Sequence, residues 1–206
     1  MTGTRLVWPT LAELPEYVAA LERGWSPDNV QPEKAVREQL ARIAQDPEGF
    51  LAGMDDPEAR EGPVERPDGS FVPRLPGIRR WIWHDGFCGS IGLRWQDGTS
   101  ELPGYVLGHI GYSIVPWRRR AGHATWGLAL MLTDARGRGL EWVEVTTQPG
   151  NIPSQRVILG CGGVLVGTFE KAAAYGGGEA LLFRIDLANR SQAATTQAAT
   201  TREDQP

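Results

Sequence analysis

The chain has 206 residues, of which 41% are hydrophobic and 22% are charged, values typical of a globular domain with a sizeable core. No apolar run approaches the roughly 18 residues that cross a membrane, and the N-terminus lacks the basic-then-apolar pattern of a signal peptide. Two cysteines are too few for a disulfide framework, and neither has a partner at metal-ligand spacing. We therefore expect a cytoplasmic protein without a membrane anchor or a metal.

Charge is unevenly distributed along this chain, whose formal net charge is −4. Acidic side chains outnumber basic ones over residues 1–75, and basic side chains outnumber acidic ones over 76–140. Three consecutive arginines, Arg118, Arg119 and Arg120, lie in the second range. A local basic centre in an acidic protein suits one small anion better than a long polyanion, so we do not expect nucleic acid as a partner.

The first part of the chain predicts helices. Apolar residues at helical spacing predict amphipathic helices over 10–23 and 32–45, the second with Pro32 near its start. Residues 46–77 are rich in Pro, Gly, Asp and Glu, which predicts a long loop around a short helical piece. Long loops in compact domains are often functional.

From residue 80 onward the pattern changes to strands alternating with helices. His84-Asp85-Gly86 between two apolar runs predicts a β-hairpin. In chain order we expect strands at 80–83, 87–95 and 108–115, a helix over about 121–136, a strand at 140–147, a helix over 151–159, and a closing hairpin of strands at 163–170 and 180–187. Residues 189–206 lack apolar periodicity and are expected to be disordered, which leaves one domain over 1–188.

The turn between a strand and the 121–136 helix carries the most informative motif. Residues 119–124 read R-x-x-G-x-A, with the small residues Gly122 and Ala124 where the backbone must approach a ligand closely. The first amides of a helix have no intrahelical partners and suit a pyrophosphate. Taken alone, the motif is explained equally well by solvated arginines and a turn glycine, and it is neither a dinucleotide fingerprint nor a Walker A loop.

The order of the elements around this motif makes it more specific. The strand HIGYSIVP, the turn, the helix, the next strand and NIPSQRVI follow one another in an order that resembles the GNAT superfamily of N-acetyltransferases. The resemblance covers residues 108–170, and the closing FRIDL resembles a bacterial predicted-acetyltransferase subgroup. It implies an α/β fold with a mixed, mostly antiparallel central sheet and helices on both faces, and acetyl-CoA as co-substrate.

The resemblance also implies which residues bind the coenzyme. Backbone amides from Arg120 to Ala124 would hold the pyrophosphate, and Ile114 and Val115 would pair with the pantetheine arm like an added strand. A strand amide near Val115 would bind the developing oxyanion. The expected cofactor-binding residues are Ile114, Val115, Arg119, Arg120, Ala121, Gly122, His123, Ala124 and Asn151, the last with helix capping as its alternative. The family often has glycine at the position of Arg120.

The expected chemistry needs a base and an acid. His109 is the candidate base, at a position where many GNAT members have glutamate, with a packed structural histidine as the alternative. Many relatives place a tyrosine acid seven residues after the position of Asn151, where this chain has Ile158. Ser154 resembles a serine that some relatives place near the coenzyme sulfur, with helix capping as its alternative. Tyr112 and Tyr175 are further candidates for the acid.

Together these features predict an N-acetyltransferase that moves the acetyl group of acetyl-CoA to a primary amine by direct attack in a ternary complex. The acceptor would be a small-molecule or peptide amine bound between the early helices, the 46–77 loop and the 96–107 loop. The alternative is a non-catalytic acyl-CoA-binding module, which the missing tyrosine favours. The sequence leaves open the identity of the amine, the acyl-chain preference and whether the chain forms a homodimer.

Overall fold

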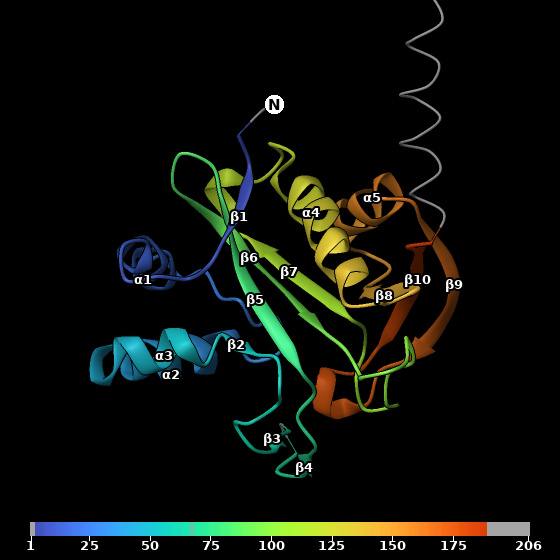
Figure 1. Cartoon of the computed structure of the whole chain (residues 1–206), viewed down its shortest axis with the longest axis horizontal. Coiled ribbons are helices and arrows are strands. Elements are labelled where there is room, and N and C mark those ends of the chain that lie inside the picture. The colour runs from blue at the N-terminus through green and yellow to red at the C-terminus, as the bar shows by residue number, and fades with distance from the viewer. Residues whose placement is uncertain (1–2, 67, 189–206) are drawn as a thin grey trace, which may run out of the picture.

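Two antiparallel sheets lie side by side at the centre of the computed structural model, which describes residues 3–66 and 68–188 (Figure 1). The first sheet has the order β1-β5-β6-β7, with β2 paired to β5, and the second has the order β8-β10-β9. The strands are β1 (Arg5–Val7), β2 (Asp55–Asp56), β5 (Gly77–Trp83), β6 (Phe87–Arg94), β7 (Ile110–Ile114), β8 (Trp142–Thr147), β9 (Gly163–Glu170) and β10 (Glu179–Asp186). A separate short pair joins β3 (Val64–Glu65) and β4 (Phe71–Val72).

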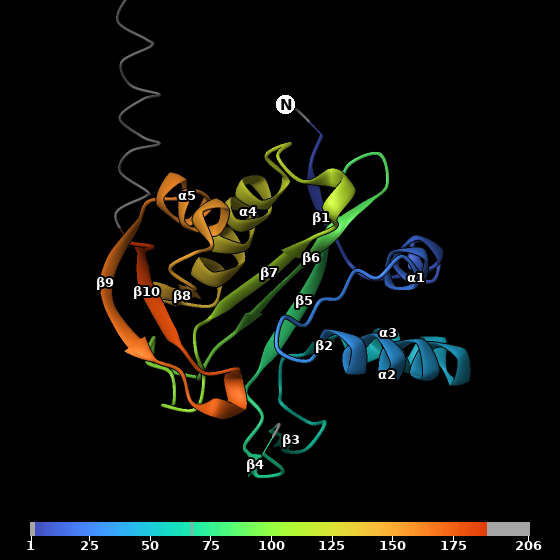
Figure 2. The same cartoon turned by 180° about the vertical axis from the view of Figure 1, so that it is seen from behind.

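Helices cover both faces of the first sheet (Figures 1 and 2). One face carries α1 (Leu14–Glu22), α2 (Pro32–Gln45) and α3 (Pro47–Ala52), and the other carries α4 (His123–Gly137), beside which α5 (Ile152–Gly160) packs on β8 and β9 of the second sheet. Two short 3₁₀ turns span Pro116–Arg118 and Ala173–Tyr175. The predicted α/β fold with a mostly antiparallel sheet and helices on both faces is confirmed.

Element boundaries agree with the sequence pattern where local signals are strong. The predicted helix 32–45 and strand 163–170 have the predicted ends. The first helix begins at Leu14 rather than at residue 10, with a proline in its first turn, where a missing amide has no effect. The strand β1 was not predicted, because three residues are too few for alternation to show and its pairing with β5 is a long-range contact.

The two faces of the sheet have cores of different character. Leu128, Met131 and Leu132 of α4 are fully buried against the sheet on one face. On the other face the core is aromatic, and the ring of Tyr17 stacks on that of Trp81 with centroids 4.8 Å apart. A Cβ on Gly127 would lie 2.7 Å from Cδ1 of Ile82, so α4 packs directly on β5. Packing on both faces therefore fixes the position of β7 and of the α4 N-terminus.

Some expectations concern segments or features beyond this core. The expected disorder of 189–206 concerns a segment that lies outside the described residues. Within 3–66 and 68–188, no helix combines the length and apolar character needed to cross a bilayer. In the same ranges, no group of three or more His, Cys, Asp or Glu side chains is placed to hold a metal ion.

Candidate functional site

The strands β7 and β8 meet at one end and then separate into different sheets (Figure 2). At the joined end the His109 amide donates to the Glu144 carbonyl at 2.8 Å, and the Glu144 amide donates to Nδ1 of the His109 ring at 2.9 Å. Beyond this point β7 is the edge strand of its sheet. The separation leaves backbone groups of β7 without a strand partner on the side that faces β8.

Backbone groups of β7 alternate between β6 and this open edge. The Val115 amide donates to the Cys88 carbonyl at 3.0 Å, and the register pairs Ile114 with Gly89. In an antiparallel pair of this register, the amides of Ile114 and Tyr112 point away from β6. The Val115 amide is already engaged, so the expected oxyanion donor near Val115 can only be a neighbouring amide such as that of Ile114 or Tyr112. The pairing of Ile114 with a pantetheine arm stays a prediction.

The turn before α4 presents unused amides. Arg120 and Gly122 adopt left-handed conformations, with φ of 63° and 77°, and turn the chain sharply at the helix start. The first helical hydrogen bond runs from the Trp126 amide to the Gly122 carbonyl, and no side chain caps α4. Among the described residues, no acceptor is hydrogen-bonded to the amides from Arg120 to Thr125. This helix end can therefore bind an anion through backbone donors.

The three consecutive arginines have three different environments. Arg118 donates through Nη2 to the Asp85 carbonyl at 2.7 Å and so fastens the β5–β6 hairpin. Arg119 donates through Nε to the Ile114 carbonyl at 3.2 Å, at the open edge of β7. The side chain of Arg120 is exposed, and within 3–66 and 68–188 it makes neither an ion pair nor a hydrogen bond. Arg119 and Arg120 thus remain close to the unused amides.

His123 contributes its backbone rather than its ring to this turn. The ring is buried, its Nδ1 lies 3.1 Å from Oγ1 of Thr4, and its centroid lies 5.3 Å from that of His84. Desolvation, followed by the charges of His84 and Arg118, lowers the pKa of His123. The lowered pKa favours the neutral ring, which is part of the packing behind the turn.

A hydroxyl pair bridges β7 and α5 beside the open edge. The Tyr112 hydroxyl lies 2.8 Å from Oγ of Ser154, and burial raises the pKa of Tyr112 to about 12. Asn151 caps α5 by accepting from the Ser154 amide at 3.2 Å, which confirms the capping alternative. Ile158, where many relatives have the tyrosine, is fully buried in the core. The sequence named Tyr112 and Ser154 separately, and nothing local to either residue indicates that they meet.

His109 does not have the surroundings of a general base. It is fully buried, and desolvation lowers its pKa to about 4 against an opposing effect of the Ser100 backbone. Its Nδ1 accepts from the Glu144 amide, and its Nε2 is buried near Ser100 without a hydrogen bond of normal geometry. A base needs a lone pair that the substrate can reach. The structure therefore contradicts the catalytic prediction and favours the packed alternative.

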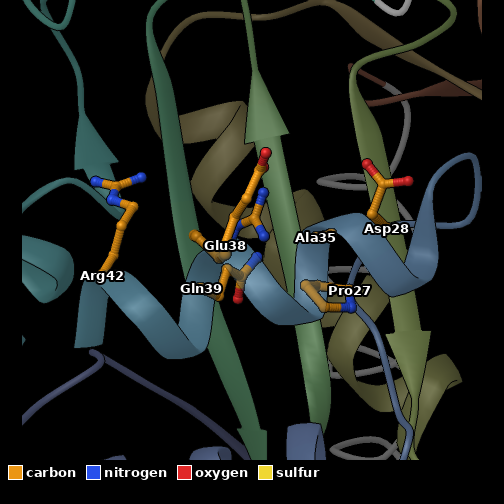
Figure 3. A pocket seen from close by; sticks show the side chains of 7 residues that line it. Pro27, Asp28, Ala35, Glu38, Gln39 and Arg42 are labelled. Atoms are coloured by element: carbon orange, nitrogen blue, oxygen red, sulfur yellow. The ribbon is translucent and has the colours of Figure 1, made fainter. Parts of the chain in front are cut away.

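An open hollow of about 270 Å³ lies on the other face of the sheet, between α2 and β5 (Figure 3). The residues that line it come from α2, from the segment before α2 and from β5: Pro27, Asp28, Ala35, Glu38, Gln39, Arg42 and Arg79. Gln39 accepts a hydrogen bond from the buried Tyr17 hydroxyl, which anchors α2 to the aromatic core. The hollow thus lies at one of the early helices that the sequence analysis placed around an acceptor, and none of its lining residues belongs to the 46–77 or 96–107 segments.

The family profile of the GNAT acetyltransferase domain matches residues 30–164. The chain belongs to the GNAT acetyltransferases. A comparison with curated proteins found no match. The family assignment agrees with the geometry, because the unused amides at the α4 N-terminus and the open edge of β7 lie within the matched residues.

Solved GNAT structures share this fold at low sequence identity. The microcin C7 self-immunity acetyltransferase MccE, solved with acetyl-CoA and AMP, is 12% identical, with 90% of this chain and 93% of MccE covered and a TM-score of 0.60. RimL, a ribosomal L7/L12 α-N-protein acetyltransferase solved with coenzyme A, is also 12% identical, with 90% and 95% covered and a TM-score of 0.58. RimJ of Mycobacterium smegmatis, solved with CoA-disulfide, is 20% identical, with 93% and 89% covered and a TM-score of 0.55.

Proposed function

We propose that this GNAT protein transfers the acetyl group of acetyl-CoA to a primary amine by direct attack in a ternary complex. One observation carries the proposal: the amides from Arg120 to Thr125, which have no acceptor among the described residues, lie at the end of the unpaired edge of β7. A helix N-terminus suits a pyrophosphate, and a strand edge suits an extended arm. MccE and RimL, which share the fold, were solved with acetyl-CoA and coenzyme A.

Each part of the coenzyme has a matching group in the chain. The amides of Arg120, Ala121, Gly122, His123 and Ala124 would hold the pyrophosphate, and the exposed guanidinium of Arg120 would meet a phosphate oxygen. Ile114 and Tyr112 would pair with the pantetheine arm along the open edge. Arg119, which donates to the Ile114 carbonyl, would turn toward the phosphates when the arm takes that carbonyl. Asn151 acts through its cap, which holds Ser154 in place.

The reaction needs a neutral amine, an oxyanion donor and a proton for the thiolate. An aliphatic ammonium with a pKa of about 10.4 is only about 0.04% neutral at pH 7. The nitrogen attacks the thioester carbonyl carbon, the amide bond forms, the C–S bond breaks and the amine loses a proton to water. The Tyr112 amide would stabilise the oxyanion. The Tyr112 hydroxyl, which stays protonated because its pKa is about 12, would donate a hydrogen bond to the departing thiolate with Ser154 as its hydrogen-bond partner, and the thiolate would take its proton from water.

A non-catalytic acyl-CoA-binding module is the second candidate. Two observations favour it: His109 is fully buried, and Ile158 replaces the usual tyrosine. Incubation of the pure protein with acetyl-CoA and a panel of amines, with free thiol as the readout, separates the two. We expect thiol release that depends on the amine. Thermal stabilisation by acetyl-CoA without thiol release on any amine would favour the binding module, and the absence of stabilisation would overturn both.

The binding site itself is tested by a charge at the helix start. Ala124→Glu places a carboxylate among the proposed phosphate donors and should weaken acetyl-CoA binding at least about 100-fold, equivalent to about 2.7 kcal/mol. Ala124→Gln is the matched control, because it adds nearly the same volume without charge, and it should bind at least about tenfold more tightly than Ala124→Glu. Equal affinities of the two variants would show that the pyrophosphate lies elsewhere.

A further inference from the structure

On the face of the first sheet that lies opposite α4, neighbouring glycines on β6 and β7 form a strip that leads to the open edge of β7. Arg79 on β5 lies opposite Gly92 on β6, and Gly92 lies opposite Gly111 on β7. Arg79 lines the hollow beneath α2, which identifies this face as the α2 side. Because side chains alternate along a strand, Gly92 and Gly111 leave this side of β6 and β7 bare. Gly111 itself is exposed.

A second arginine lies directly over this strip. Arg94 is two residues beyond Gly92 on β6 and therefore points to the same side. A Cβ built on Gly111 would lie 3.8 Å from Nη2 of Arg94, so the guanidinium covers the backbone of β7. Neighbouring strands lie about 4.8 Å apart, so the long side chain of Arg79, two strands away, can reach the same area.

Neither guanidinium group forms a close ion pair with a carboxylate among the described residues, although Asp28 and Glu38 line the same hollow as Arg79. Arg74, Arg80 and Arg184 form ion pairs with carboxylates, whereas no carboxylate within 3–66 and 68–188 pairs with Arg79 or Arg94. Desolvation and then the positive charge of Arg79 lower the pKa of Arg94, which agrees with two neighbouring cations. The Arg94 side chain is nonetheless exposed, and this exposure decides whether a solute can reach it. Two neighbouring guanidinium groups, one on the exposed Arg94 and one on the half-buried Arg79, suit an oxyanion.

We propose that the acceptor amine carries an oxyanion, a carboxylate or a phosphate, that binds Arg94 and Arg79 over Gly92 and Gly111. This inference rests on the proposed function, because Gly111 precedes Tyr112, whose amide faces the proposed thioester. An amine attached a few bonds from the bound oxyanion would reach the thioester across the edge of β7. The two guanidinium charges would also disfavour the ammonium form of that amine and so raise its reactive fraction.

Paired acceptors test the substrate class. We expect kcat/KM to be at least about tenfold higher for phosphoethanolamine than for ethanolamine, or for β-alanine than for β-alaninamide. The pair with the larger ratio shows whether the site prefers a phosphate or a carboxylate. Arg94→Gln should reduce this preference to within about threefold, mainly through KM, and Arg79→Gln should reduce it less. Arg37→Gln, which removes an exposed arginine of α2, is the matched control and should keep the preference. Equal kcat/KM values for the anionic acceptor and the uncharged acceptor of both pairs would overturn the proposal.

A binding measurement keeps this inference separate from the proposed function. Titration of inorganic phosphate without acetyl-CoA, followed by the amide NMR signals of Gly92 and Gly111, should shift both signals in the wild type and in Arg37→Gln. Neither signal should move in Arg94→Gln, whose fold is checked by its thermal transition. Signals that stay in place in the wild type, or move equally in Arg94→Gln, would overturn the oxyanion site. Phosphate shifts at these glycines together with no thiol release from any amine would overturn the transfer reaction and retain the site.

Discussion

His109 and Glu144 exchange two hydrogen bonds at the point where β7 and β8 separate. One runs between backbone groups, and the other ends on the buried imidazole. Because the ring accepts through Nδ1, it must be the neutral tautomer with its hydrogen on Nε2. This pair of hydrogen bonds therefore determines where the open edge of β7 begins. The bond to the ring persists only while the imidazole of His109 stays neutral.

Acid should destabilise the fold through this histidine. The pKa of His109 is about 4 in the folded protein, below the value of about 6.5 expected in the unfolded chain. Between these values the unfolded state binds more protons, so the free energy of unfolding decreases as the pH falls from about 6.5 toward 4. The contribution lost is up to about 3 kcal/mol. Urea unfolding at several pH values measures this slope.

The control for this prediction is His109→Gln. His123, whose pKa is also lowered, makes the free energy of unfolding depend on pH in the same direction. The pH slope of the wild type must therefore be compared with that of the variant, because a protein without His109 still has a slope. His109→Gln should be less stable near neutral pH and should show a shallower slope. Where it remains folded, its turnover should have the pH dependence of the wild type. An unchanged stability slope, or the loss of a pH-rate limb near neutrality, would contradict the structural role of His109.

Replacement of Arg120 by glycine should stabilise the protein. Arg120 has a φ of 63°, and the left-handed conformation costs a residue with a side chain about 1–2 kcal/mol. Glycine relieves this strain, although it adds some freedom to the unfolded chain. Arg120→Gly should raise Tm by roughly 2–4 °C, by calorimetry. Arg120→Val, with its branched side chain, should lower Tm, and a lower Tm for Arg120→Gly would contradict the strained turn.

Tyr112→Phe should slow turnover without weakening coenzyme binding. The phenylalanine keeps the ring but removes the hydroxyl that lies 2.8 Å from Oγ of Ser154. Loss of a hydrogen-bond donor to the developing charge typically lowers kcat about 100-fold or more, and the KM for acetyl-CoA should stay within about threefold. Steady-state kinetics of Tyr112→Phe, Ser154→Ala and the double variant measure the separate effects on kcat and on the KM for acetyl-CoA.

The double variant separates a shared role from two independent ones. Because the hydroxyls form one pair, the double variant should be little slower than Tyr112→Phe alone. Tyr105→Phe is the matched control, since that hydroxyl donates to the Pro73 carbonyl away from α5. Its kcat should be within about threefold of the wild type. A rise in KM with unchanged kcat for Tyr112→Phe would reduce Tyr112 to a binding or packing residue.

Restoring a tyrosine at the family's usual position should fail in this chain. Ile158 is fully buried, and its Cγ2 lies 2.5 Å from where a Cβ on Gly163 would be. Ile158→Tyr should therefore destabilise the fold by roughly 1–3 kcal/mol through overpacking and should not raise kcat. Ile158→Val, which only removes a methylene, should lose about 0.5–1.5 kcal/mol in denaturant unfolding. A faster Ile158→Tyr enzyme would mean that this position faces the coenzyme.

The sequence by itself determined features that depend on residues close together in the chain. The R-x-x-G-x-A turn, the capping of α5 by Asn151 and the extents of α2 and β9 follow from interactions among residues close in the chain, and backbone preferences reveal such features. The left-handed φ of Arg120 was not expected, because an arginine side chain disfavours that conformation and gives no sign of it in a sequence.

Only the tertiary structure decided the roles of the buried and paired groups. His109 meets Glu144 across 35 residues and Tyr112 meets Ser154 across 42, and neither contact has a local signature. Arg79 and Arg94 belong to different strands, and the bare strip between them and β7 exists only in the paired register. A pKa or a hydrogen bond depends on burial and on neighbours distant in the chain, so the exclusion of His109 as a base and the oxyanion site both required the folded arrangement.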